Sequence, residues 1–392
     1  DFPTLGYNSK YELRDADDRE DSGLDLREGM AERNHPIELK NGIRGDDGYE
    51  IDFEIVIGTA VDQTAIAPGT LVKQWKDVDR NYFHYKMEQP MINFYAIVSA
   101  RYEVLEDTWV APNDSLKRPV DLEIYYHKGH AYNVKRMMTA MKQSFNYFST
   151  NFSHYPYEQM RIMEFPRYAE FAQSFPTAVP FSEGIGFMLD INDDSDVDMV
   201  SFITAHELAH QWWGLQVVAA NVQGRHLILE TLAQYSALMV LRQQYSEAKV
   251  QQFLKGELES YFSGKAKDEQ EELPLALVEK EDYVYYRKGA VNMYALQDYI
   301  GEAKVNLALQ RFIKDWNAFD TNFNKDRYAT TNDLLAYFRE VTPKHLQYVI
   351  SDLFESNIIY DNKVVDYESN KLDNGNYNLD IDFTVSKYKT DL

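Results

Sequence analysis

Cysteine is absent from all 392 residues of this chain. Disulfide bonds and thiolate metal sites are therefore excluded, and a protein without disulfides is compatible with either side of a membrane. The sequence also has no run of about 18 apolar residues, so no membrane-spanning helix is predicted. The first residues contain no basic region, apolar run or starting Met, so we expect a processed or excised piece of a longer protein.

Positive charge is scarce, with 40 Lys and Arg residues against 63 Asp and Glu residues and a formal net charge of −23. A chain of this charge repels nucleic acid and anionic membrane surfaces, so we predict no nucleic-acid partner. Solubility is the favoured explanation for the acidity, and a preference for basic substrates is the alternative.

Apolar and polar residues alternate from Tyr49 to Ile57, which predicts a strand. Further strands are predicted at 71–75, 81–87, 93–106 and 120–126. We therefore predict an N-terminal β domain with a polar leading segment over residues 1–126.

Apolar residues at helical spacing dominate the middle of the chain. Helices are predicted near 132–152, 198–213, 224–245, 247–263, 285–300, 302–317, 331–341 and 344–356, with a strand at 159–165. Alternation returns at 363–387, around the hairpin signal Asp373-Asn374-Gly375-Asn376. The fold class is thus α+β multidomain: a mainly α domain over 127–360 follows the β domain, and a second β domain starts at 361–392.

The five residues His206-Glu207-Leu208-Ala209-His210 lie in a predicted helix. Residues i and i+4 are about 40° apart around a helix axis, so both imidazoles face the same way and can chelate one zinc ion. Glu207 is offset by about 100° and is placed to hold a water molecule beside the metal as a general base.

A catalytic zinc site needs a third protein ligand. Glu230 is the only charged residue in the apolar run from Leu227 to Leu241, and a buried lone carboxylate is costly unless it meets a cation. We therefore predict one zinc ion per chain, bound by His206, His210 and Glu230. Gln234, one helical turn after Glu230, is placed to orient that carboxylate.

Histidines also occur at position 226 and in the segment 127–130. His226 is one turn before Glu230, and it is an alternative ligand, a partner of a ligand or a residue without a role. The segment His127-Lys128-Gly129-His130 reads as a turn after a strand rather than as a site.

The segment His206-Glu207-Leu208-Ala209-His210-Gln211-Trp212-Trp213-Gly214 resembles the zinc helix of the aminopeptidase N family of gluzincin metallopeptidases. The resemblance implies a thermolysin-like catalytic domain, a zinc ligand at Glu230 and a peptide substrate. Tyr286-Arg287-Lys288-Gly289 is similar to the family's Tyr-x-Lys-Gly, so the resemblance also implies that Tyr286 stabilises the oxyanion.

One departure concerns the family's Gly-x-Met-Glu-Asn segment, whose Glu binds the free amino group of the substrate. When the segments are aligned on Phe181-Ser182-Glu183, Gln173 and Ser174 fall in it, and Ser174 replaces that Glu. We expect both residues to line the substrate site, and exopeptidase action is in doubt.

The segments 171–176 and 230–238 resemble the peptidase-like domain attached to bacterial ABC-2 type permease proteins. That subgroup implies membrane permease segments in the same full-length protein and favours an extracytoplasmic location. The leading hypothesis is a zinc metallopeptidase. The alternative is a catalytically weak, zinc-containing binding or regulatory domain of a membrane transport complex.

Overall fold

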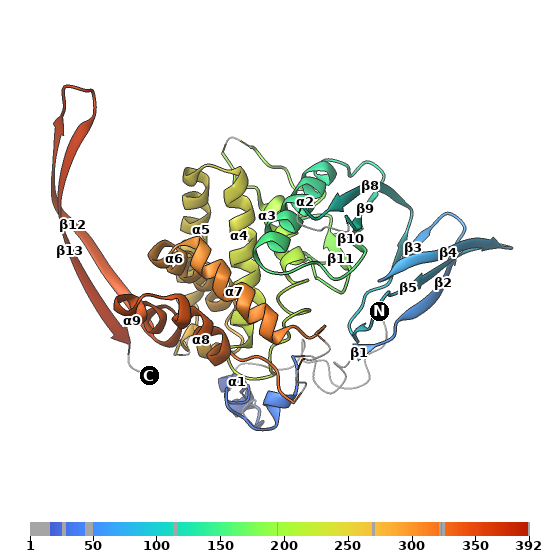
Figure 1. Cartoon of the computed structure of the whole chain (residues 1–392), viewed down its shortest axis with the longest axis horizontal. Helices are drawn as coiled ribbons and strands as arrows, with labels where there is room; N and C mark the ends of the chain where they lie inside the picture. The colour runs from blue at the N-terminus through green and yellow to red at the C-terminus, as the bar shows by residue number, and fades with distance from the viewer. Residues whose placement is uncertain are drawn as a thin grey trace.

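The computed structural model describes residues 16–25, 29–43, 50–112, 117–193, 195–268, 271–320, 323 and 326–390. Small β-sheets lie at one end of the molecule, helices fill the centre and a long hairpin extends from the other end (Figure 1). This arrangement confirms the predicted α+β class, with a β region before the helical region and a β region after it.

Seven short strands form the N-terminal β region. Their bounds are β1 Glu50–Ile51, β2 Glu54–Ala60, β3 Thr64–Ile66, β4 Thr70–Asp77, β5 Arg80–Lys86, β6 Met91–Ile92 and β7 Val98–Ala100. Strands were predicted at the positions of β2, β4 and β5, whereas β3 and β6 were not predicted. They pair as β2-β5-β4, β1-β6 and β3-β7. A short helix, α1 Ala16–Asp21, and a 3₁₀ turn, η2 Glu38–Lys40, precede them.

The single strand predicted over 93–106 is wrong. The chain forms β7 there and then begins β8, Tyr102–Val110. Strand β7 pairs with β3 whereas β8 pairs with β9, so the backbone changes sheet near Arg101 and one continuous strand cannot serve both partners.

A four-stranded sheet, in the order β11-β10-β9-β8, lies against the helices. Its other strands are β9 Pro119–His127, β10 Gln159–Phe165 and β11 Ala178–Ser182. Strands β9, β10 and β11 are parallel, and β8 is antiparallel to β9. This sheet contains strands from both sides of the domain boundary predicted between residues 126 and 127. The bounds of the three domains therefore stay a prediction.

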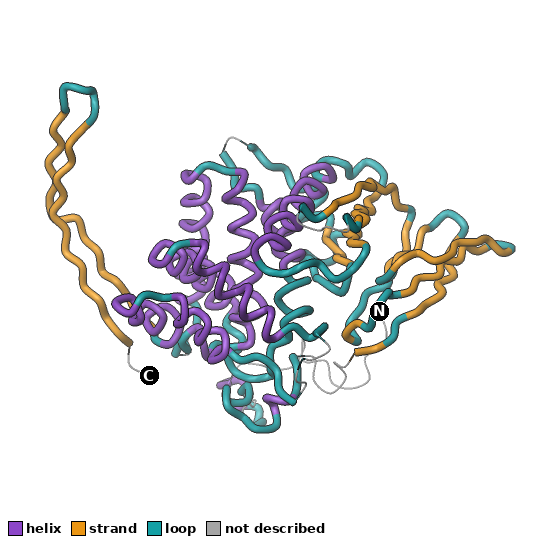
Figure 2. The backbone as a smooth tube through the Cα atoms, in the orientation of Figure 1, coloured by secondary structure: helices purple, strands orange, loops and turns teal. Residues whose placement is uncertain are grey.

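Helices occupy the predicted positions (purple in Figure 2). The longer ones are α2 Val134–Asn151, α3 Met199–Ala209, α4 Leu232–Gln244, α5 Glu247–Lys265, α6 Gly289–Ile300, α7 Glu302–Trp316 and α8 Thr331–Val341. The short ones are η4 Leu227–Thr231, η5 Leu275–Leu277, η6 Tyr283–Lys288, η7 Lys344–Leu346, α9 Gln347–Ile350 and η8 Ser351–Glu355. Helix α3 packs between α2 and α4. Among the helices of the described residues, none combines the length and the apolar character that crossing a bilayer requires.

The C-terminal hairpin consists of β12 Asn357–Lys371 and β13 Tyr377–Thr390. Its turn contains Gly375 at φ 87°, a conformation that glycine adopts without steric cost. The hairpin signal in the sequence is therefore confirmed, and the two strands extend away from the helices (Figures 1 and 2).

Candidate metal centre

Helix α3 begins at a capped end and is buried along its length. The Asp198 carboxylate accepts hydrogen bonds from the backbone N–H of Ser201 at 2.9 Å and from its hydroxyl at 2.7 Å. A side-chain oxygen at this position satisfies a helix N–H that has no partner within the helix. Since the helix is apolar on nearly every side, His206 and Glu207, each 6% exposed, are held inside the protein.

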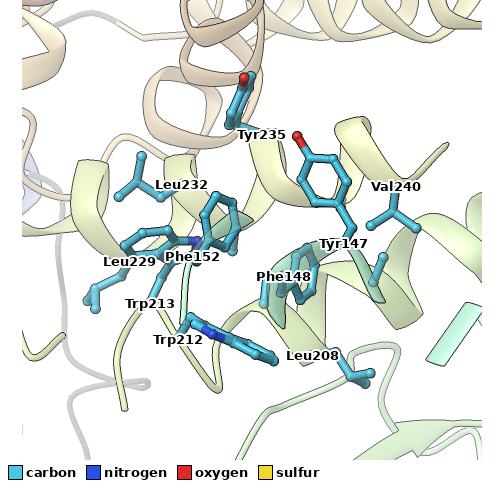
Figure 3. Packing of buried hydrophobic residues seen from close by; sticks show 14 of the residues in the cluster. Tyr147, Phe148, Phe152, Leu208, Trp212, Trp213, Leu229, Leu232, Tyr235 and Val240 are labelled. Atoms are coloured by element: carbon cyan, nitrogen blue, oxygen red, sulfur yellow. The ribbon is translucent and has the colours of Figure 1, made fainter. Parts of the chain in front are cut away.

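Aromatic side chains pack around the C-terminal end of α3 (Figure 3). The Trp212 ring lies edge-on to Phe148 at a centroid distance of 5.1 Å, and Trp213 lies edge-on to Phe152 at 5.2 Å. The indole N–H of Trp213 donates to the hydroxyl of Ser236 on α4, the helix that follows Glu230 directly, so the segments that carry the predicted ligands are tied together. Aromatic side chains bury large areas in fixed geometries, and this packing gives the ligands a rigid base.

The three predicted zinc ligands converge on one point. The Nε2 atoms of His206 and His210 lie 3.1 Å apart, and Oε2 of Glu230 lies 3.4 Å from each. Tetrahedral zinc with bonds of about 2.0 to 2.2 Å holds its ligand atoms about 3.3 to 3.6 Å apart. The two 3.4 Å distances fall within this range, and the His–His distance is only slightly below it.

The surroundings of these donors also suit a cation. Nδ1 of His210 lies 3.0 Å from the carbonyl oxygen of Trp213, a contact that assigns the proton to Nδ1 and leaves the Nε2 lone pair for a metal. Oε2 of Glu230 is buried and has no hydrogen-bond donor among the described residues. Burial opposes a charge on Glu230, yet the two imidazoles outweigh burial and hold its pKa well below the usual range. A buried carboxylate kept ionised beside two imidazoles fits zinc.

Glu207 lies beside the metal ligands and has a raised pKa. Burial is the main cause, and the nearby imidazoles of His206 and His210 oppose it. The backbone N–H of Ser174 also reaches the Glu207 carboxylate. A carboxylate whose pKa is raised toward neutrality is suited to accept and return a proton.

Tyr286 is adjacent to the same group. Its ring lies 5.8 Å from that of His206, and its hydroxyl is close enough to the Glu230 carboxylate to feel its charge. Burial, followed by the charge of Glu230, raises the pKa of Tyr286, so the phenol stays protonated and remains a hydrogen-bond donor. The structure therefore places Tyr286 beside the predicted metal ligands, and its role in stabilising the oxyanion stays a prediction.

Other predicted site residues have different surroundings. The hydroxyl of Ser174 accepts a hydrogen bond from Gln211 at 2.8 Å, and Ser174 is only 4% exposed. The side-chain N–H of Gln173 donates to the carbonyl of Ser174 at 3.4 Å. Among the described residues, no hydrogen bond links Gln234 to Glu230, so the orienting role of Gln234 has no support in the contacts.

His226, the residue left open, stacks on Tyr285 with ring centroids 4.5 Å apart. Burial and the neighbouring Arg225 lower the pKa of His226 to about 4, so the imidazole is neutral at physiological pH. His206, His210 and Glu230 form the metal-ligand group, and His226 is not part of it.

Three features of the site were missed by sequence reasoning. Gln211, which follows α3, donates hydrogen bonds to the hydroxyl of Ser174 and to the carbonyl of Phe175. The segment 172–175 in turn forms β-bridges beside β11. The strand β11 itself was missed because Pro180 interrupts its pattern, and proline is confined to edge strands. Glu230 and Tyr286 also lie on short π-helical segments, η4 and η6, whose five- and six-residue lengths give no periodic signal.

The fold and the site together define a candidate zinc centre, in which α3 and η4 supply His, His and Glu. Residues 132–353, more than half of the chain, match the family model of the peptidase family M1 domain. The chain therefore belongs to peptidase family M1.

Individual relatives agree with this assignment. Human (Homo sapiens) endoplasmic reticulum aminopeptidase 2 is 25% identical over 171 residues, which cover 42% of this chain and 18% of that protein. A crystal structure of M1 zinc metallopeptidase from Deinococcus radiodurans has a TM-score of 0.60 at 16% identity, covering 79% of this chain and 64% of that one. A mutant of the Deinococcus enzyme gives 0.61 at 16% identity, with 80% and 68% covered. At this identity the structural likeness shows the fold alone.

Proposed function

We propose that this chain is a zinc-dependent peptidase that hydrolyses peptide bonds. The observation that carries the proposal is the convergence of His206, His210 and Glu230, with Glu207 and Tyr286 beside them. Membership of family M1 supports the same reaction class.

Each residue has a chemical task in this reaction. When bound, zinc polarises the carbonyl group of the scissile bond and lowers the pKa of a bound water molecule. Glu207 accepts a proton from the attacking water and returns it to the leaving amine. Tyr286 donates its hydroxyl hydrogen bond to the oxygen on which negative charge develops.

Substrate selection separates this chain from a standard aminopeptidase. Ser174 replaces the carboxylate that would bind the amino group of the substrate, and its hydroxyl is already bonded to Gln211. We therefore propose an aminopeptidase-like enzyme that does not depend on a free N-terminus, with Gln173 and Ser174 bordering the substrate through their backbone.

The test is digestion of a peptide library, with free and with acetylated N-termini, by the wild type and by Glu207→Gln. The wild type should cleave both kinds of peptide, whereas Glu207→Gln should bind zinc normally and lose turnover. Cleavage restricted to free N-termini would refute the substrate proposal and leave the peptidase proposal intact. Equal cleavage by both proteins would refute the role of Glu207.

The second candidate is a catalytically weak binding or regulatory domain of a membrane transport complex. Its support is the buried, already bonded Ser174 hydroxyl, which leaves the usual amine-binding position without a charge. Attachment to permease segments and an extracytoplasmic location belong to this proposal. Zinc-loaded wild-type protein that leaves every library peptide intact would favour it over the peptidase.

A further inference from the structure

A second group of possible metal ligands lies at the end of the four-stranded sheet. Strands β9, β10 and β11 are parallel, so their carboxyl ends lie at the same edge of the sheet. His130 follows β9, Glu164 is near the end of β10 and Glu183 follows β11 directly. One ligand atom from each residue lies within 4.8 Å of the others. The carboxyl ends of parallel strands are a common position for binding sites.

Backbone hydrogen bonds orient both carboxylates toward His130. Oε2 of Glu164 accepts the backbone N–H of His127 at 2.5 Å, and its Oε1 forms a direct hydrogen bond with Nδ1 of His130. Oε1 of Glu183 accepts the backbone N–H of Arg167 at 3.0 Å, and its Oε2 lies 3.6 Å from the same Nδ1. Each carboxylate thus has one oxygen fixed by the backbone and the other directed at a common point. Metal ligands are held by this kind of outer hydrogen bond.

The charges of the group are unbalanced. Glu164 is fully buried, and Glu183 has a side chain that is 25% exposed. Within the part of the chain that the structure describes, neither carboxylate forms an ion pair with Lys or Arg, and His130 is their only possible cation. Holding the buried Glu164 carboxylate and the partly buried Glu183 carboxylate close together is costly, and a divalent ion between them would reduce that cost.

A second imidazole borders the group. The ring of His127 lies edge-on to His130 with centroids 6.0 Å apart, and its Nε2 is buried without a hydrogen-bond partner among the described residues. An imidazole with two carboxylates suits zinc or another first-row transition ion, because calcium and magnesium prefer oxygen ligands alone. The partly exposed side chains of His130 and Glu183 give such an ion a route from solvent.

We propose that His130, Glu164 and Glu183 form a second divalent-metal site, distinct from the site on α3 and η4. The ion joins the turn after β9 to the ends of β10 and β11. It therefore has a structural role, and the chemistry of the first site does not require it.

Zinc titration of the full, metal-free chain against a chromophoric chelator tests this proposal. The wild type should bind two zinc ions and Glu183→Gln one. The double variant His206→Ala/His210→Ala should also retain one ion, because its second site is intact. Glu183→Gln keeps an oxygen that can accept the N–H of Arg167, so its rate of peptide cleavage should stay within about twofold of the wild type.

The opposing explanation is that a protonated His130 alone neutralises the two carboxylates. The wild type would then bind one zinc ion and the double variant none, and the proposal would be overturned. It would equally be overturned if the wild type bound two ions and both Glu183→Gln and His130→Gln still bound two. The numbers of zinc ions bound by the wild type and by His206→Ala/His210→Ala do not depend on whether Glu183→Gln or His130→Gln folds.

Discussion

Two adjacent tyrosines differ in what their side chains touch. The Tyr286 hydroxyl lies close to the zinc ligand Glu230, whereas the Tyr285 ring stacks on His226. The peptide backbone alone would not distinguish them, and the family pattern Tyr-x-Lys-Gly was needed to select Tyr286 from the sequence. In the structure Tyr286 is the tyrosine of the pair whose ring lies next to His206, so the predicted donor role can be tested on it.

Tyr286→Phe should lower kcat on the order of 10² to 10³ with little change in KM, because one donor to the developing oxyanion is removed. The measurement is steady-state cleavage of a peptide found in the library, with zinc content determined in parallel. Tyr285→Phe is the matched control, since it keeps the stacking ring and should cleave at close to the wild-type rate. Equal losses in the two variants would contradict the role given to Tyr286.

The π-helical segments η4 and η6 are connected through Thr231. Its hydroxyl donates to the carbonyl oxygen of Tyr285 at 2.6 Å. Gly289, the first residue of α6, lies so close to Thr231 that an added Cβ would be 2.4 Å from the Thr231 hydroxyl oxygen. The Thr231 hydroxyl thus supplies a donor to the backbone of η6 from the neighbouring segment and holds the two segments together.

Thr231→Val should therefore reduce kcat and destabilise the protein by about 1 to 3 kcal/mol, because a shielded carbonyl loses its donor. Thr231→Ser retains the hydroxyl and should recover most of the activity. Zinc content should be unchanged in both, so kinetics and denaturant unfolding are the measurements. Full activity of Thr231→Val would show that the contact does not position Tyr286.

The cap of α3 should make stability depend on pH. Burial favours the neutral form of Asp198, but hydrogen bonds from Ser201, Tyr245 and Arg136 outweigh it and lower the pKa. A lowered folded-state pKa contributes stability above the unfolded value of about 4, and this contribution is lost as the pH falls through the folded value.

Asp198→Asn keeps an oxygen for the cap but removes the charge. It should cost on the order of 2 kcal/mol at pH 7, the scale of a hydrogen bond to a charged group. The difference in unfolding free energy between variant and wild type should shrink below pH 4. Comparing the two proteins in urea from pH 7 to pH 3 cancels titrations that they share. A difference that stays constant with pH would contradict the assignment.

Apolar residues at helical spacing predicted much of the fold, and ionisable residues isolated within apolar runs predicted the three metal ligands. Both signals are local, because they depend on residues within a few turns of one another. The group of His130, Glu164 and Glu183 depends instead on which strands are parallel neighbours, and the sequence does not state that pairing. In the sequence His130 appears only as part of a turn, because the strands that carry Glu164 and Glu183 to it come much later in the chain.

At the scale of the whole molecule, the apolar residues fall into two classes. The helical body shares one continuous core, whereas the hairpin of β12 and β13 has an apolar face that is open to solvent. Alternate residues of β13 form that face, and each is at least 44% exposed: Tyr377, Leu379, Ile381, Phe383 and Val385. A two-stranded ribbon buries little, so its apolar residues should contribute little to the stability of the body.

Two phenylalanines test this separation. Phe354 of η8 is fully buried, and its replacement by alanine should cost about 3 to 5 kcal/mol through lost burial and a cavity. Phe383 is 65% exposed, and Phe383→Ala should change the unfolding free energy by less than about 0.5 kcal/mol. Urea unfolding followed by helical circular dichroism measures both. A large loss in Phe383→Ala would mean that the open face is covered in solution, and a dependence of that loss on protein concentration would identify a second copy as the cover.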